Sequence, residues 1–445
     1  MATKQDDDTL RRGLTNYLDT VESLRELAYF SESHAEHLDD LNSFIAKKLS
    51  GLVEISPETV KKARGIFDDY LGDVVKLLES TNNTSTDANS KEKRREFQEE
   101  VKRLTNDMGG KFKTVAGADI DGSFLMPLVV SALTNTYPRS NLLAASLLTM
   151  CVGSFEVLVG AIVRAFFRLR PDALKQDEPK ITWSELQDYK TIDDFRDHYI
   201  ERHATEIMRG GLKDWFAWLD KRLKVNLGDL CANPAALQEI FQRRHLLVHA
   251  DGIVNKQYLN SVSDADPMPE LGDKVVVSYE YLYDAIESLT AVGVLLTYKV
   301  RRRLTPPVEF EKDEHYFEKR ISALLIGRQY PAVEKIAEVL VGQLCNDDVR
   351  LRLQVDLWTA RRALYGAESI KSEVELWRVG SLSDKFILAK HVLLGEVTHA
   401  KELARKMLDS GEITYSWGAQ WPLMGELLND MRNEVLITDV SSLPE

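Results

Sequence analysis

The stretch "IFQRRHLLVHADGIVNKQYL", Ile240–Leu259, places a charged residue in the apolar pattern of a helix. Leu237, Phe241 and Val248 are spaced so that they share one helix face, which we expect to be buried. Arg244 falls on that face. Because an unpaired charge loses several kcal/mol when it leaves water, a guanidinium there is expected beside a carboxylate, a phosphate or a water-filled cleft.

The neighbouring residues predict where this helix begins and ends. Asn233 is a suitable N-cap residue, and Pro234 fits the first turn. Gly252 follows an expected end near Ala250 and is suited to a C-terminal cap. The sequence therefore predicts a helix with well-marked ends.

Two histidines lie in the last turns of this helix. His245 and His249 are one turn apart and so adjacent, whereas Arg244 and His249 are separated by roughly 140° around the axis. The C-terminal end of a helix carries a partial negative charge, which favours cations. An arginine and two imidazoles are therefore predicted to lie close together at this helix end.

The composition limits the protein class. The chain has 445 residues, which is typical of about three domains, and 44% are hydrophobic. Its net charge of -13 argues against a protein that covers nucleic acid by bulk charge, but a local basic site stays possible. Cys151, Cys231 and Cys345 are too few and too far apart for a disulfide framework or a CxxC metal site. The acidic, polar N-terminus "MATKQDDDTLRRG" differs from a secretory signal, so we expect a cytoplasmic protein.

One segment, "LLAASLLTMCVGSFEVLVGAIV" (Leu142–Val163), is long and apolar enough to span a bilayer. Its single charged residue, Glu156, would be costly inside a membrane, whereas a buried helix tolerates one acid with a partner. We therefore expect a core helix and no membrane association.

The periodicity of apolar residues predicts an all-α fold in three regions. Residues 1–137 form an N-terminal helical region with a polar linker near 80–90 ("STNNTSTDANS"), and a glycine-rich stretch at Met108–Gly122 is expected to be a loop. Residues 138–306 form a bundle of four helical parts, the second interrupted near Gly210 and Gly211.

Residues 312–445 form a C-terminal region of amphipathic helices. Gly327 and Gly395 are 68 positions apart, twice the repeat length of about 34 in tetratricopeptide arrays, and plain helical hairpins are the alternative. We interpret this region as an interaction module without a catalytic group of residues.

The segment "RRHLLVHADGIVNKQYL" resembles the signature of HEPN domains, which are all-helical modules with an R-x4-H motif. The arginine, the polar residue and the histidine of that motif match Arg244, His245 and His249. Arg243 would give the R-x5-H form, which the family also permits. The resemblance covers the helices from about Asn141 to Leu304.

The resemblance implies a metal-independent endoribonuclease that works as a homodimer, with two motif helices forming one composite cleft. His249 is then the acid or base, Arg244 holds the phosphate, and His245 positions the substrate or donates a second proton. Glu156, Arg243 and Asn255 are candidate supporting residues. No cofactor and no metal ion is expected.

Simpler roles exist for each residue. Arg244 can pair with Glu156 or Glu239 inside the bundle, and the two histidines can be part of a metal site, although no third ligand is evident. Arg164 and Arg168, and likewise Arg301–Arg303, can guide RNA or be solvated helix ends.

The family analogy leads to a ribonuclease of a bacterial toxin or antiphage system, with RNA as substrate and an antitoxin or sensor protein as a further partner. The alternative is a non-catalytic module that binds RNA or a nucleotide within a defence complex. A helical scaffold is the third reading.

Overall fold

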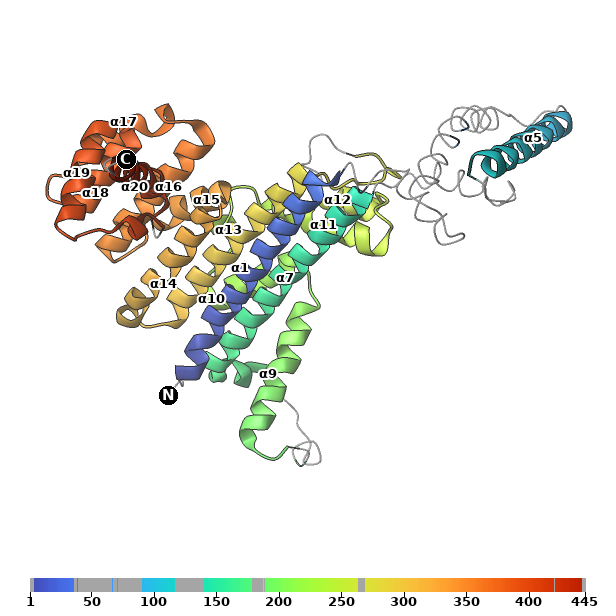
Figure 1. Cartoon of the computed structure of the whole chain (residues 1–445). Coiled ribbons are helices and arrows are strands. Elements are labelled where there is room, and N and C mark those ends of the chain that lie inside the picture. Colours follow the sequence, from blue (N-terminus) through green and yellow to red (C-terminus); the bar gives the residue numbers. More distant parts are fainter. Residues whose placement is uncertain are drawn as a thin grey trace. The chain divides into compact units, whose positions relative to one another are not determined.

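The computed structural model describes residues 4–35, 90–116, 139–177, 189–262, 269–419 and 421–441, with the single positions 38, 66, 70 and 187 (Figure 1). The all-α prediction is confirmed: these residues form helices and contain no strand, only one isolated bridge between Ile253 and Lys274. The α-helices are α1 (Lys4–Ser33), α5 (Ser90–Ala116), α7 (Arg139–Leu169), α9 (Ile192–Met208), α10 (Leu212–Leu223), α11 (Pro234–His249), α12 (Lys256–Ser261), α13 (Tyr279–Leu304), α14 (Pro307–Ile326), α15 (Tyr330–Leu340), α16 (Asp347–Tyr365), α17 (Glu368–Leu376), α18 (Asp384–Leu394), α19 (Val397–Asp409) and α20 (Pro422–Ser441).

The chain forms two compact units. Residues 1–28 join 145–445 in one unit, and residues 29–144 form the other. This grouping differs from the expected regions 1–137, 138–306 and 312–445, because α1 packs with helices from much later in the sequence. Its buried face consists of Leu10, Leu14, Tyr17, Leu18, Val21, Leu24 and Ala28.

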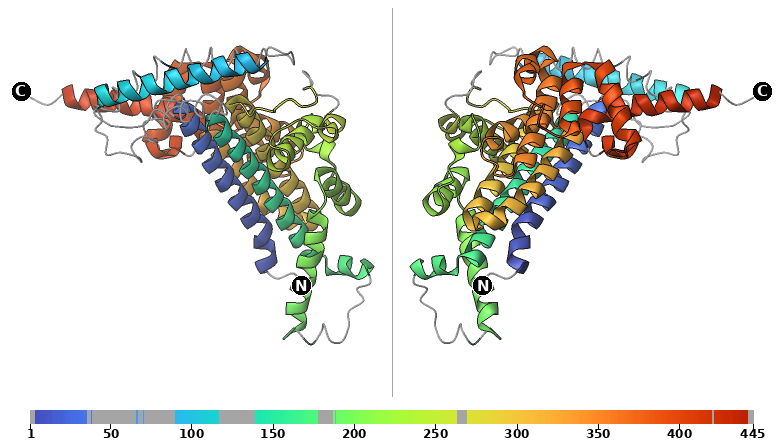
Figure 2. Two further views of the ribbon diagram at one scale, coloured as in Figure 1. Left: turned by 90° about the vertical axis from the view of Figure 1, so that its right-hand side faces the viewer. Right: turned by 90° about the vertical axis from the view of Figure 1, so that its left-hand side faces the viewer.

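In the first unit, α1, α7 and α13 run side by side as long rods (Figures 1 and 2). Two glycines allow their close approach. A Cβ atom on Gly13 would lie 3.2 Å from the Cβ atom of Ala161, and one on Gly293 would lie 2.6 Å from Cε1 of Tyr17. The absence of a side chain at Gly13 and Gly293 therefore allows the helices to contact each other closely.

Several charged residues inside this unit form ion pairs. Arg301, only 2% exposed, donates from Nε to Oδ2 of Asp313 at 2.6 Å. Arg11 of α1 contacts the other oxygen of the same carboxylate. Arg25 of α1 lies 3.4 Å from Glu287 of α13. Because a buried charge is stable only with a partner, these pairs fix α1 against α13 and α14.

Several expected boundaries are confirmed. The second part of the bundle is interrupted where predicted: α9 ends at Met208, and Gly211 is the N-cap residue of α10. The loop expected at Met108–Gly122 is wrong for residues 108–116, because α5 continues to Ala116 and Gly110 lies in open space. Residues 117–122, and the linker at 80–90 except Ser90, lie outside the described residues.

The apolar segment forms α7, the one helix of the described residues that is long and apolar enough to cross a membrane. Half of the most apolar 18-residue segment of α7 is buried within the fold, which is compatible with a core helix. Beyond α14, each helix from α15 to α18 packs against the next one along the chain, as in helical hairpins. A regular repeat stays a prediction.

Candidate functional site

The local sequence fixes α11 as predicted. Asn233 Oδ1 accepts a hydrogen bond from the backbone N–H of Ala236, and Pro234 occupies the first turn. After the end of the helix, Gly252 adopts a left-handed φ of 74° and its N–H donates to the carbonyl oxygen of Leu246. The caps satisfy backbone groups at both ends, so the arginine and the histidines lie on a well-defined helix.

A groove of about 1030 Å³ lies beside this helix. One wall is α7 and the other is α11, and the turn between α9 and α10 and a part of α12 complete it. Four cationic residues line it: Arg164, Arg209, Lys213 and Arg244. Two of its residues are carboxylates, Glu156 and Asp214. The lining is therefore rich in positive charge although the whole chain is acidic.

Not all of these cations are neutralised. Arg164 pairs with Glu201 at 2.8 Å, whereas no carboxylate partner of Arg209 or Lys213 occurs among the described residues. Both residues are exposed and contribute to the groove lining beside Gly210 and Gly211. They are available for an anion that enters from solvent.

Arg244 lies in the groove wall, beside an acid from another helix. Its Nη2 atom donates to Oε2 of Glu156 at 3.0 Å, and the two side chains are 27% and 28% exposed. Burial raises the pKa of the Glu156 carboxyl above its usual value, and the nearby guanidinium opposes that shift. Val248, expected on the buried face, is 48% exposed, so the buried stripe ends before Arg244.

Three polar atoms of groove residues are buried without a hydrogen-bond partner in the part of the chain that the structure describes. They are Nε of Arg244, Nε1 of Trp215 and Oε1 of Gln238. A buried polar group without a partner costs about 1–3 kcal/mol, so natural proteins rarely keep one for packing alone. Residues of the groove wall thus carry two donors and one acceptor that no described group satisfies, although these atoms are themselves buried.

The two histidines lie differently. Their ring centroids are 4.7 Å apart, and His245 lines the groove while His249 is exposed at the helix end. The separation of Arg244 and His249 around the helix axis explains this arrangement. The predicted trio is therefore brought together at one helix end, with only two of its members in the groove wall.

Arg243 and Asn255 have structural contacts. Arg243 donates to Glu239 at 2.7 Å and to the carbonyl oxygen of Val276 at 2.9 Å, and its guanidinium lies 4.0 Å from the ring centroid of Tyr281. Asn255 caps α12 by accepting from the backbone N–H of Tyr258. Neither lines the groove.

The same Glu239 accepts hydrogen bonds from the hydroxyls of Tyr258 and Tyr281. Burial raises the pKa of both tyrosines well above the usual value, so they stay protonated donors. Glu239 therefore joins α11, α12 and α13 and is not the partner of Arg244.

Sequence reasoning did not identify Gln238, Trp215, Arg209 and Lys213 as site residues. Gln238 lies two turns before His245 on α11, and this spacing is the only sequence feature that indicates it. Arg209 comes from the α9–α10 turn, and Lys213 and Trp215 come from the first turn of α10, which approaches α11 only through tertiary contacts such as that of Trp215 with Phe241. Of the arginines expected to guide RNA, Arg301 is buried and paired with Asp313.

Comparison with known proteins yields no relative: no protein-family model, no curated protein and no solved structure matches this chain.

Proposed function

We propose that this chain is a metal-independent endoribonuclease whose reaction takes place at Arg244, His245 and His249. The observation that carries the proposal is the position of Arg244 and His245 in the wall of a groove open to solvent, with the ring of His249 adjacent to that of His245 at the helix end. A guanidinium sealed inside the bundle would have no access to a phosphate. The exposed cations Arg209 and Lys213 extend the positive lining along which an RNA backbone would lie.

The residue types suit cleavage by internal attack. One imidazole removes the proton of the ribose 2′-hydroxyl, the 2′-oxygen attacks the adjacent phosphorus, and the bond to the 5′-oxygen breaks. The second imidazole gives a proton to the leaving 5′-oxygen. Arg244 holds the nonbridging oxygens as negative charge develops on them. The products are a 2′,3′-cyclic phosphate and a free 5′-hydroxyl, and no metal ion takes part.

A homodimer is part of the proposal. Val157 on α7 and Val248 on α11 are 71% and 48% exposed, and each is close in sequence to one member of the Arg244–Glu156 pair. A second copy that covers these apolar residues would bring a second His249 toward the groove. Light scattering should give twice the mass of one chain, and Val157→Lys should reduce it to one.

The decisive test is degradation of total RNA by the purified protein in EDTA. We expect cleavage by the wild type and a loss of about 10²–10⁴-fold in His249→Ala and in Arg244→Met. His198→Ala, which changes an exposed histidine of α9 outside the groove, is the matched control and should cleave normally. Ends that carry no 2′,3′-cyclic phosphate would contradict the mechanism.

A binding module is the second candidate, since the same groove suits RNA that is held and not cut. If neither the wild type nor His249→Ala cleaves RNA, but Arg244→Met weakens binding, this function replaces the first. A cytoplasmic role in a toxin or antiphage system, with an antitoxin or sensor partner, belongs to the proposal through the HEPN resemblance alone.

A further inference from the structure

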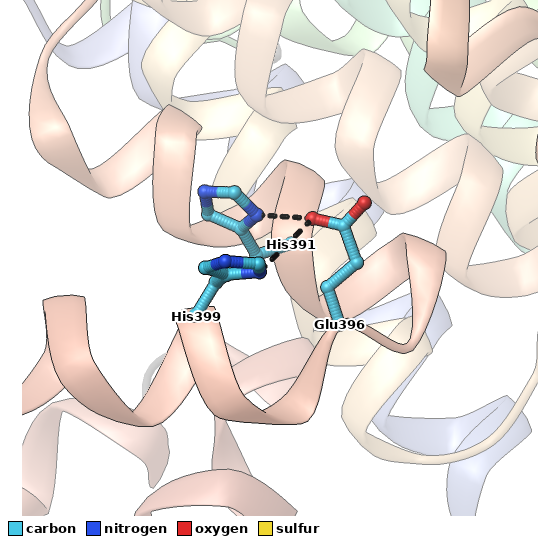
Figure 3. Close-up of side chains that lie close together, drawn as sticks. All are labelled: His391, Glu396 and His399. Atoms are coloured by element: carbon cyan, nitrogen blue, oxygen red, sulfur yellow. Dashed lines mark hydrogen bonds and ion pairs between the residues drawn. The ribbon is translucent and has the colours of Figure 1, made fainter.

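A second group of side chains, suited by type to metal binding, lies far along the chain from the groove residues. His391, Glu396 and His399 approach one another where α18 is followed by α19 (Figure 3). Nδ1 of His391 and Oε2 of Glu396 are 2.5 Å apart, and Nδ1 of His399 lies 4.0 Å from the same oxygen. One ligand atom from each residue can be chosen so that all three lie within 4.8 Å of one another.

The backbone holds these residues in place. Gly395 closes α18 in the left-handed conformation with φ of 72°, which residues other than glycine rarely adopt. The N–H of Glu396 donates to the carbonyl oxygen of His391 at 2.9 Å, across the turn. His391 therefore sits in the last turn of one helix, and His399 in the first turn of the next.

The helices beneath the turn are firmly packed. Phe386, Ala389 and Leu393 of α18 and Ala400 and Ala404 of α19 are buried in one apolar cluster. The turn consequently has a rigid support, which is what a preorganised binding site requires.

The donor set matches a metal ion. Two imidazole nitrogens and one carboxylate oxygen are common ligands of Zn²⁺. With bonds of about 2.0–2.1 Å, ligand atoms around a tetrahedral ion are about 3.3 Å apart. The distances of 2.5 and 4.0 Å each differ from that value by less than about 1 Å, which side-chain rotation can supply.

We propose that His391, Glu396 and His399 bind one divalent transition-metal ion, with Zn²⁺ the best fit to the donors. The ion would join the end of α18 to the start of α19. The exposed fractions of the three side chains, 28%, 42% and 69%, give it a path from solvent and leave a coordination position open for water or another ligand. Within the described part of the chain this group includes a third candidate ligand, whereas the pair His245 and His249 has none.

The test uses the full chain carrying His245→Gln and His249→Gln, so that the other adjacent histidines do not contribute. Titration with ZnCl₂ in a calorimeter should give one saturable site, and Co²⁺ should give the visible absorption of a tetrahedral complex. His399→Gln and Glu396→Gln should each lower the affinity at least about tenfold and remove that absorption. Zn²⁺ should also raise the Tm of the background protein and not that of His399→Gln.

Two matched controls test the assignment: Glu402→Gln removes an exposed acid from the same helix, and His198→Gln removes an exposed histidine elsewhere. Both should bind Zn²⁺ as the background protein does. An unchanged affinity in His399→Gln, or binding that does not saturate, would overturn the proposal. The ribonuclease proposal is tested in EDTA, so the two can fail separately.

Discussion

Arg244 of α11 and Glu156 of α7 are 88 positions apart in the sequence and form one ion pair in the wall of the groove. Both side chains keep more than a quarter of their surface in solvent. A pair of this kind is weaker than a sealed one, because water screens each charge. It can therefore hold the guanidinium in position and still yield it to a phosphate.

The strength of this pair can be measured with a double-mutant cycle. Arg244→Met, Glu156→Gln and the double variant should give a coupling free energy of about 0.5–1.5 kcal/mol in urea unfolding. A coupling above about 3 kcal/mol would show a structural pair that no ligand opens.

Glu156→Gln should also strengthen binding of RNA, because it removes a negative charge beside the expected phosphate. A 2′-deoxy oligonucleotide analogue, which cannot react, should bind about threefold to tenfold more tightly to this variant in fluorescence anisotropy. Asp214→Asn, which removes the other carboxylate of the groove lining, is the comparison for a general charge effect. Weaker binding to Glu156→Gln would mean that Glu156 itself contacts the ligand.

Substitution by lysine should have opposite effects on stability and cleavage at the two adjacent arginines, Arg243 and Arg244. Arg243→Lys loses the planar group that contacts Glu239, Val276 and Tyr281, so we expect a loss of about 1–3 kcal/mol in the free energy of unfolding and normal cleavage by the folded protein. Arg244→Lys should keep its stability and lose cleavage. Equal effects on both properties would contradict the separation of their roles.

Gly293 should be intolerant of a side chain. A Cβ atom there would lie 2.6 Å from the Tyr17 ring and 3.1 Å from Leu158, so Gly293→Ala should cost about 1–3 kcal/mol in thermal or urea unfolding. Gly153→Ala on α7 is the control, since a Cβ atom there meets nothing within 4 Å. Without a clash, it should stabilise the protein by up to about 1 kcal/mol through helix propensity.

The buried carboxyl of Asp356 should make stability depend on pH. Burial raises its pKa from 3.8 to about 7, and Ser322 donates to one of its oxygens. Because the folded state keeps this proton to higher pH than the unfolded chain, the stabilisation is complete below about pH 4 and is lost as pH rises through 7.

Asp356→Asn, which carries no titratable proton, should remove this part of the pH dependence. Between pH 5 and 8 the wild type should lose on the order of 2–4 kcal/mol more than the variant in urea unfolding. Glu287, whose pKa burial also raises to about 7, remains in both proteins and cancels in the comparison. Parallel pH profiles would show that Asp356 is ionised in the folded state throughout this range.

The features predicted correctly from the sequence are mostly local. The ends of α11 follow from Asn233, Pro234 and Gly252, which act on the backbone within a few residues. Of the two acids considered for Arg244, Glu156 is correct. Glu239 is wrong as that partner because it lies one turn before Arg243 and is already held by two tyrosine hydroxyls.

The features that were missed depend on tertiary contacts. The position of α1 depends on the contacts of Arg11 with α14 and of Tyr17 with α13. No local sequence pattern predicts contacts between such distant segments. The expected burial of Val248 failed because the last turn of α11 buries a different face, on which Leu246 packs against Val254 and Tyr258. His391, Glu396 and His399 are near neighbours in sequence, but their side chains come together only because the chain turns at Gly395.

The contact between Arg11 and Asp313 joins positions that are 302 residues apart. At the usual translation rate of about 5–20 residues per second, the ribosome delivers the second residue roughly 15–60 s after the first. During that interval the apolar face of α1 lacks the part of its cover that α13 supplies. The nascent chain should therefore depend on chaperones until Asp313 has left the ribosome and the contact with Arg11 can form.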